Sequence, residues 1–165
     1  MSRSIQIIFN KILGIIRKRG MSMKRYISKE EDIYYTDMLK VINAIGGRNL
    51  DYNWLITEIE TSTGDYFNDE YVIVSNDELL DKLEKKKIQW IWGTFSAIPK
   101  NYTEAEILKY KLPGVDNIEK KEIKPQHPLA EIEIIAYDST FVQIIGKEKI
   151  AEKFKRIYPK AKEKL

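Results

Sequence analysis

The chain has 165 residues and no cysteine, and its 28 lysines and arginines against 25 aspartates and glutamates give a net charge of +3. This length suits a single domain with its own core, and the lack of cysteine excludes disulfides and cysteine-ligated zinc. The one histidine excludes a multi-histidine metal site, and we expect no metal and no cofactor. The absence of cysteine suits a reducing compartment, so we expect a cytoplasmic location.

The first twenty residues form a basic amphipathic extension. They carry five cations and no acid beside an apolar set that comprises Ile5, Ile8, Phe9, Ile12, Leu13, Ile15 and Ile16. The set is too short to span a bilayer, and no signal-peptide cleavage pattern accompanies it. Two interpretations stay open: a helix on an anionic membrane surface or on the body, or a segment that is not native because translation starts at Met21 or Met23.

Residues 21–165 are expected to form one domain, and its first half begins with a helix. A capping box at residues 28–31, followed by apolar residues at helical spacing, predicts a helix over about 29–45. Partial alternation over 52–60 predicts a strand, and a short apolar run over 71–74 predicts another. The polar, acidic stretch between these two strands is typical of an exposed turn.

The second half continues with short elements. A capping box at residues 75–78 opens a short helix that ends in three lysines, and a strand with an aromatic face is predicted over 88–98. A third capping box, at 103–106, opens a two-turn helix, and a last helix follows Gly146. Between these helices, hairpin spacing separates two β-rich runs, 130–137 and 141–145. The predicted fold is α+β, with about five mainly antiparallel strands and four or five helices packed on the sheet.

The distribution of charge is the most informative feature of the chain. Residues 49–82 carry nine carboxylates against one lysine, whereas the two ends, 1–20 and 147–165, are basic. Aromatic residues interleave with these acids, and aromatic groups beside charges are typical of interface hot spots. A segregated field of this kind attracts partners of opposite sign and is no evidence of a reaction.

We find no catalytic constellation and expect the protein not to be an enzyme. His127 lies in a proline-rich loop with no orienting carboxylate that the sequence can place, so a structural or surface role is the simpler interpretation. Glu58 and Glu60 stand at i and i+2 of one strand, as a glycosidase-like pair or a cation site would, but a solvated strand face explains them more simply. No Walker loop, nucleophile elbow or dinucleotide fingerprint is present.

Three strings of the C-terminal half, over about 88–159, are IQWIWGTFSAIPK, NYTEAEILKYKLP and HPLAEIEIIAYDSTFVQIIGKEKIAEKFKRIYP. This half resembles small uncharacterised bacterial proteins, some of them associated with toxin-immunity loci, and no functional residue can be carried over from them. The resemblance implies a non-enzymatic antidote that occludes a toxin. It agrees with the acidic segment, because nuclease toxins are basic and their inhibitors typically bind them with carboxylates and aromatic groups.

We therefore expect an immunity or inhibitor protein that neutralises a basic protein partner, such as a bacterial toxin, through an acidic and aromatic surface. The candidate contacts are Glu58, Glu60, Asp65, Tyr66, Phe67, Asp69 and Glu70. The alternative is a protein that binds nucleic acid or a membrane surface through its basic ends, where lysines could meet phosphates. Nucleic acid is the less favoured partner, because the body is acidic and no helix-turn-helix or RNP signature is apparent.

Overall fold

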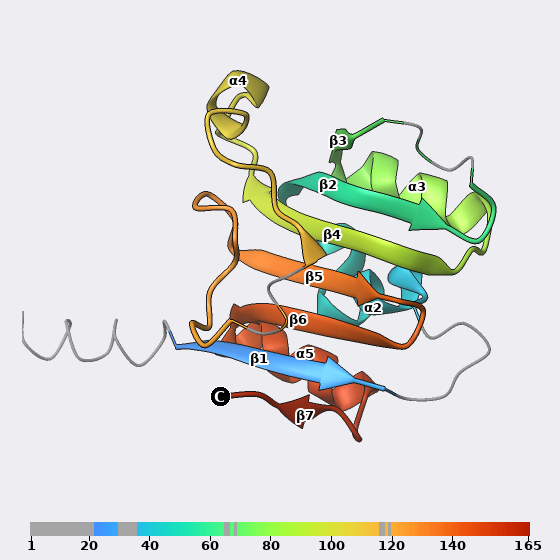
Figure 1. Ribbon diagram of the computed structural model, residues 1–165, viewed down its shortest axis with the longest axis vertical. Coiled ribbons are helices and arrows are strands. Elements are labelled where there is room, and N and C mark those ends of the chain that lie inside the picture. Colours follow the sequence, from blue (N-terminus) through green and yellow to red (C-terminus); the bar gives the residue numbers. More distant parts are fainter. Residues whose placement is uncertain (1–21, 30–35, 65–66, 68, 116–117, 119) are drawn as a thin grey trace, which may run out of the picture.

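The computed structural model describes residues 22–29, 36–64, 67, 69–115, 118 and 120–165. Its strands are β1 (Met23–Ser28), β2 (Tyr52–Thr61), β3 (Tyr71–Ser75), β4 (Trp90–Pro99), β5 (Ile132–Tyr137), β6 (Phe141–Lys147) and β7 (Lys162–Glu163). Its helices are α2 (Met38–Ile45), the short 3-10 helix Gly47–Asn49, α3 (Asn76–Lys85), α4 (Glu104–Ile107) and α5 (Glu148–Ile157). The strands form one sheet in the order β3-β2-β4-β5-β6-β1-β7, with every neighbouring pair antiparallel (Figure 1).

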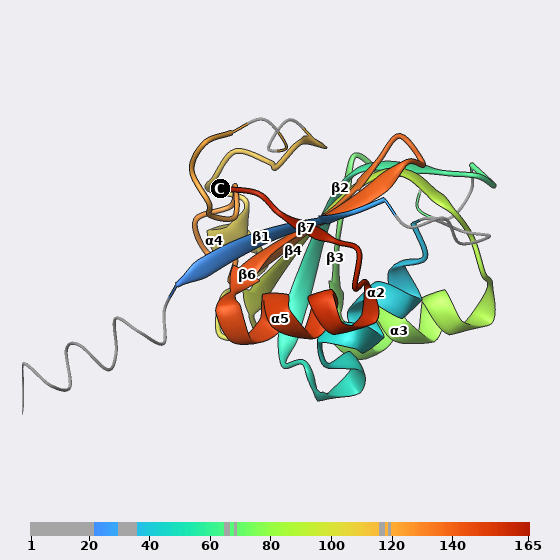
Figure 2. The ribbon, with the colours of Figure 1, turned by 90° about the horizontal axis from the view of Figure 1, so that it is seen from below.

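The two faces of the sheet are covered differently. Helices α2, α3 and α5 pack on one face, while α4 and the connection over 108–131 lie on the other (Figure 2). The main core lies under the three helices and contains Trp54, Trp90 and Phe95, all fully buried. A second, smaller cluster on the opposite face joins Leu55, Ile98 and Ile107. The alternation of side chains along each strand separates the two sets.

The α+β class and the antiparallel sheet are confirmed, but the described residues contain seven strands rather than about five. The additional strands are β1 and β7. The first carries two adjacent cations in its six residues, and the second has only two residues, so neither shows the apolar alternation that predicts a strand. Strand β1 forms because it pairs with β6, and β7 forms because it pairs with β1. Each pairing joins segments that are more than a hundred residues apart in the sequence.

The start of the first predicted helix is wrong. Ser28 is the last residue of β1, opposite Val142, and Lys29, where the helix was predicted to begin, is not helical. Helix α2 starts at Met38, where the carboxylate of Asp37 accepts a hydrogen bond from the amide of Lys40 at 3.1 Å. A strand pairing with a segment far along the chain therefore fixes the backbone at Ser28. Residues 30–35 lie outside the described part.

The other two capping boxes are confirmed. At α3 the Ser75 hydroxyl accepts from the Glu78 amide at 3.3 Å and the Glu78 carboxylate accepts from the Ser75 amide at 2.9 Å. The same exchange joins Thr103 and Glu106 at α4, which has one turn rather than the predicted two. Of that turn only Ile107 is buried, so little apolar surface favours a longer helix.

The predicted amphipathic extension, residues 1–20, lies outside the described residues, as does Met21. Among the helices that the structure describes, none combines the length and the apolar character that crossing a bilayer requires. The last predicted helix is confirmed as α5, which follows β6 directly.

Candidate functional site: an acidic groove on the sheet

A β-bulge near the end of β2 shapes the candidate site. Thr57 lies opposite Thr94 of β4, but the next paired residue, Glu60, lies opposite Trp92, so two residues of β2 face one residue of β4. The first of these two, Glu58, has a φ of +53°. This left-handed conformation is rare for residues other than glycine and is sterically costly.

The bulge reverses which side chains face the core. In a regular strand Glu58 and Glu60 would share the face of Ile56, which packs under the helices. After the bulge, Ile59 packs against the core, while Glu58 and Glu60 are both exposed. The irregularity therefore places two carboxylates in solvent on the same stretch of strand.

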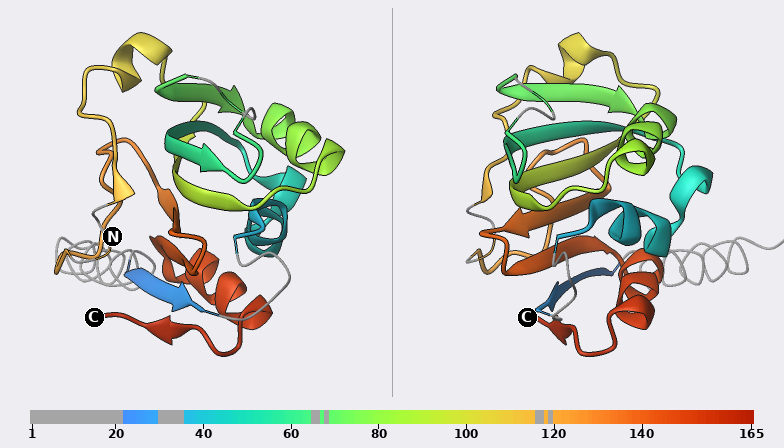
Figure 3. Two further views of the ribbon diagram at one scale, coloured as in Figure 1. Left: turned by 45° about the vertical axis from the view of Figure 1, so that its right-hand side comes forward. Right: turned by 90° about the vertical axis from the view of Figure 1, so that its right-hand side faces the viewer.

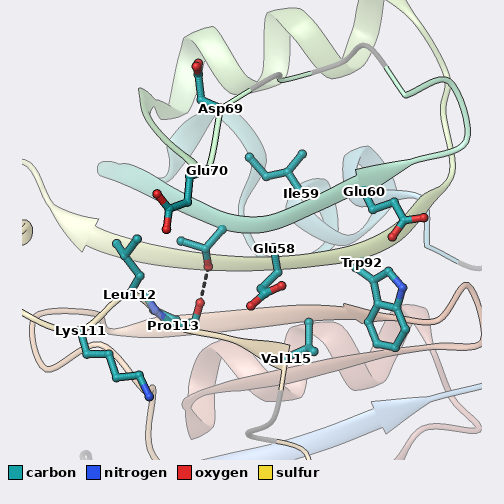
Figure 4. A pocket seen from close by; sticks show the side chains of 11 residues that line it. Glu58, Ile59, Glu60, Asp69, Glu70, Trp92, Lys111, Leu112, Pro113 and Val115 are labelled. Atoms are coloured by element: carbon teal, nitrogen blue, oxygen red, sulfur yellow. Dashed lines mark hydrogen bonds between the residues drawn. The ribbon is translucent and has the colours of Figure 1, made fainter.

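Four carboxylates line one groove of about 780 Å³ (Figure 4). Glu58 and Glu60 come from β2, and Asp69 and Glu70 come from the residues immediately before β3. The half-buried Trp92 of β4 lies at one end of the groove. Across the groove from β2, the wall is formed by Lys111, Leu112, Pro113 and Val115.

Side chains of the sheet hold that wall in place. The hydroxyl of Thr57 donates to the Pro113 carbonyl at 2.6 Å, and the hydroxyl of Thr94 donates to the Gly114 carbonyl at 3.1 Å. The side chain of Gln126 brackets the same glycine, accepting from its amide at 3.2 Å and donating to its carbonyl at 2.5 Å. The groove wall is therefore fixed by hydrogen bonds to its backbone.

A buried polar pair supports the same segment. Glu133 of β5 is fully buried and accepts a hydrogen bond from the Gln126 amide at 2.8 Å. Arg25 of β1, also buried, donates to the carbonyls of Lys120 and Glu122 at 2.6 and 2.8 Å. Burial lowers the pKa of the Arg25 guanidinium, and the negative charge of Glu133 acts in the opposite direction. These charged groups hold the connection on the sheet and do not face the groove.

The four groove carboxylates have no ion-pair partner within 4.0 Å among the described residues. The rest of the acidic stretch behaves differently. Asp51 pairs with Lys100 at 2.9 Å, and Glu78 caps α3. Arg48 pairs with three carboxylates along α3, which are Asp77 at 3.7 Å, Asp81 at 2.8 Å and Glu84 at 2.8 Å. Ordinary structural roles therefore account for that part of the stretch and leave the groove acids unexplained.

The opposite end of the sheet carries a basic cavity of about 500 Å³. Four lysines line it together with Phe141 and two isoleucines; these are Lys29, Lys160, Lys162 and Lys164. An aromatic row connects the two regions across the sheet, since Trp92 meets Tyr137 edge-on at 4.6 Å and Tyr137 stacks on Phe141 at 4.8 Å. Among the described residues, the groove carboxylates and the lysines of the basic cavity therefore lie toward opposite ends of the sheet.

His127 is buried and has a structural role. Its Nδ1 accepts from the Leu129 amide at 3.2 Å, so Nε2 carries the proton and donates to the Ile107 carbonyl at 3.1 Å. Burial lowers the pKa of the imidazole, which favours this neutral form, although the bond to Ile107 acts the other way. His127 thereby ties α4 to the connection that follows it.

The structure brings together four of the seven predicted contact residues. Glu58, Glu60, Asp69 and Glu70 line the groove, whereas Asp65 and Tyr66 lie outside the described residues. Phe67 does not line the groove: its ring lies 6.3 Å from that of Trp90, and the Lys82 ammonium lies 3.9 Å above it. The sequence analysis missed Trp92 and residues 111–115 as groove walls, because no local signal shows which face of the sheet they approach.

No cluster of three or more potential metal ligands occurs in the part of the chain that the structure describes. No protein-family model matches the chain, and neither a curated protein nor a solved structure shows significant similarity to it. The functional argument therefore depends on the geometry and charge of the groove.

Proposed function

We propose that this protein is a non-enzymatic binding protein of inhibitor or immunity type, which neutralises a basic protein partner, such as a bacterial toxin, through the acidic groove. The observation that carries the proposal is that Glu58, Glu60, Asp69 and Glu70 line one groove without an ion-pair partner among the described residues. Uncompensated carboxylates repel one another, and binding of a cationic surface relieves that repulsion. The attraction between opposite charges also raises the association rate of the two proteins.

The strained backbone at Glu58 supports the same proposal. Glycine would occupy a φ of +53° without strain, yet this position carries a carboxylate that faces the groove. Strain of this kind is commonly found at functional positions. Trp92 adds an aromatic surface beside the charges, which suits the centre of an interface.

The test uses the protein partner that is captured from the native cells and then purified. In the groove variant, Glu58→Gln, Asp69→Asn and Glu70→Gln are combined. The matched control combines Asp77→Asn, Asp81→Asn and Glu84→Gln, which removes the same number of charges from the carboxylates around Arg48. We expect the groove variant to associate at least about tenfold more slowly and with a flatter salt dependence than the control. Equal rates for the two variants contradict the proposal.

A second candidate function, binding of nucleic acid or an anionic membrane surface, is favoured by the four lysines that line the basic cavity. Phosphate binding through lysines weakens steeply as salt rises. This function predicts that a single-stranded oligonucleotide or phosphatidylserine vesicles bind at low salt and that Lys162→Gln with Lys164→Gln abolishes the binding. Unchanged binding by that variant excludes the basic cavity as the site.

A further inference from the structure

Strand β3 stands at one end of the sheet order and forms an edge of the sheet (Figure 3). Asp69 and Glu70 of the acidic groove come directly before it in the chain. All five of its residues are half-buried, and it contains neither lysine nor proline. Edge strands commonly carry lysine or proline, which block the addition of a further strand. The edge of β3 lacks these protections.

The register shows which backbone groups of β3 point outward. The amide of Ser75 donates to the Glu78 side chain and therefore points away from β2. Backbone groups alternate along a strand, so those of Ile73 and Tyr71 point the same way. Among the described residues, no hydrogen-bond partner meets these outward groups of Ile73 and Tyr71.

The neighbouring strand gives the same result independently. The carbonyl of Ala97 in β4 accepts from the Glu131 amide, so the backbone of Ala97 points toward β5. Trp54 lies opposite Ala97, and its backbone groups therefore point away from β4 and toward Val74 of β3. The backbone groups of Val74 therefore hydrogen-bond to β2, and those of its neighbour Ile73 point away from β2, toward the open edge.

Acidic side chains lie along this open edge. A groove of about 440 Å³ is lined by Tyr71 and Ile73 and by three carboxylates, those of Asp69, Glu70 and Glu104. Ile73 packs with the cluster that contains Ile107 of α4, so its side chain lies on the same face of the sheet as that helix. Backbone bonding groups and negative charge therefore meet at one edge.

We propose that the basic partner binds by adding an extended segment to β3 as an antiparallel strand, with lysines or arginines at the positions that hydrogen-bond to Tyr71 and Ile73. Directly opposite residues of an antiparallel pair place their side chains on the same face, so these cations would reach Asp69, Glu70 and Glu104. This inference rests on the proposed function and specifies how its partner is held. A second copy of the chain fits less well, since it would bring a second set of the same carboxylates to this edge.

The test uses three nine-residue peptides of alternating lysine and valine. One is unmodified, one is N-methylated on its three inner lysines, and one is N-methylated on three of its valines. All three carry the same charge, but only the lysine-methylated peptide lacks the amides that would pair with β3. The readouts are the dissociation constant from NMR titration and the hydrogen exchange of the Ile73 amide, with the Val72 amide as the internal control.

We expect the unmodified and valine-methylated peptides to bind alike, and the lysine-methylated peptide to bind more than about tenfold more weakly. The unmodified peptide should slow exchange at Ile73 and leave Val72 unchanged. Equal binding by both methylated peptides, or no binding of the unmodified peptide at millimolar concentration, overturns the strand addition.

A double variant, Asp69→Asn with Glu70→Gln, separates this inference from the proposed function. If both methylated peptides bind equally but Asp69→Asn with Glu70→Gln abolishes binding, the acidic surface stands and the strand addition fails. If the captured partner binds that variant as tightly as the wild type, the proposed function itself fails. Gel filtration of the free protein tests the second copy, and a dimer that Ile73→Pro dissociates would assign the edge to self-association and overturn the inference.

Discussion

The two edges of the sheet differ in both strand and charge. At one edge, β3 presents five residues without lysine or proline, beside carboxylates that pair with no cation among the described residues. At the other edge, β7 has only two residues and is flanked by Lys160 and Lys164. Short, lysine-rich edge strands resist the addition of a further strand. The β7 edge is therefore protected against pairing, and the β3 edge is open to it.

The two edges also differ in how their charges are satisfied. Near β7, the ammonium of Lys24 lies within 3.7 Å of three carboxylates, those of Glu148, Glu152 and Glu163. The hydrogen bond to Glu148 is the largest of the effects that raise the pKa of Lys24. The groove acids near β3 have no comparable partner among the described residues. The charge of Lys24 near β7 is thus paired within the fold, whereas the groove acids near β3 are not paired with any described residue.

The largest predicted effect tests which groups of β3 point outward. Val72→Pro removes an amide that bonds to β2 and should lower the free energy of unfolding by about 3 kcal/mol. Ile73→Pro removes an outward amide and should cost at least about 1 kcal/mol less, because proline is tolerated where the amide faces solvent. Urea unfolding of the two variants measures the difference. Equal costs would mean that the outer edge of β3 is not free.

A second prediction concerns His127, which supports α4 and hence Glu104 at the acidic edge. His127→Gln should lower the free energy of unfolding by about 2 kcal/mol, because the Leu129 amide and the Ile107 carbonyl lose a buried partner. The pKa of His127 is lower in the folded chain than its usual value of 6.5, so the unfolded chain binds the proton more readily. Stability should therefore be full above that pH and fall below it.

The measurement for His127 is the melting temperature between about pH 7.5 and about pH 5.5, where most carboxylates stay ionised. The wild type should lose stability over this range, and the His127→Gln variant should lose less. The protection factor of the Ile107 amide, which corrects for the intrinsic pH dependence of hydrogen exchange, should fall more at the lower pH than the protection factors of amides in β1. A pH response that His127→Gln leaves unchanged would assign the proton to another group.

A third prediction tests the strain at Glu58. Glu58→Gly should raise the free energy of unfolding by about 1 kcal/mol, because glycine adopts a positive φ without a steric cost. Glu58→Gln keeps the strain and removes only the charge, so its stability should match the wild type. Both variants should bind the basic partner more weakly. If Glu58→Gly is the less stable protein, the backbone at this position stores no strain.

Local sequence patterns predicted the elements whose causes are local. The capping boxes at Ser75 and Thr103 involve residues three apart, and both form as expected. The hairpin of β5 and β6 needs only a short turn between two β-rich runs. In contrast, β1 and β7 exist because they pair with distant partners, which no window of the sequence contains.

The candidate site was predicted in composition but not in shape. Counting charges identified Glu58, Glu60, Asp69 and Glu70, because an excess of acids is visible without coordinates. A regular alternation over residues 52–60, however, would put Glu58 on the side of Trp54 and Ile56, both of which the structure buries in the core. The bulge that reverses this depends on the register between β2 and β4, which a single strand does not reveal.

The smallest predicted effect compares the change in stability when acids are removed near β3 with the change when a cation is removed near β7. Asp69→Asn with Glu70→Gln relieves repulsion in the groove and should leave stability within about 0.5 kcal/mol of the wild type or slightly above it. Lys24→Met keeps the apolar stem but leaves three glutamates without their shared cation, so it should lower the melting temperature. Both shifts should shrink as salt screens the charges. Removing a carboxylate that stabilises the fold would lower the free energy of unfolding. A loss of stability in the Asp69→Asn, Glu70→Gln variant would therefore mean that these carboxylates serve the fold rather than a partner.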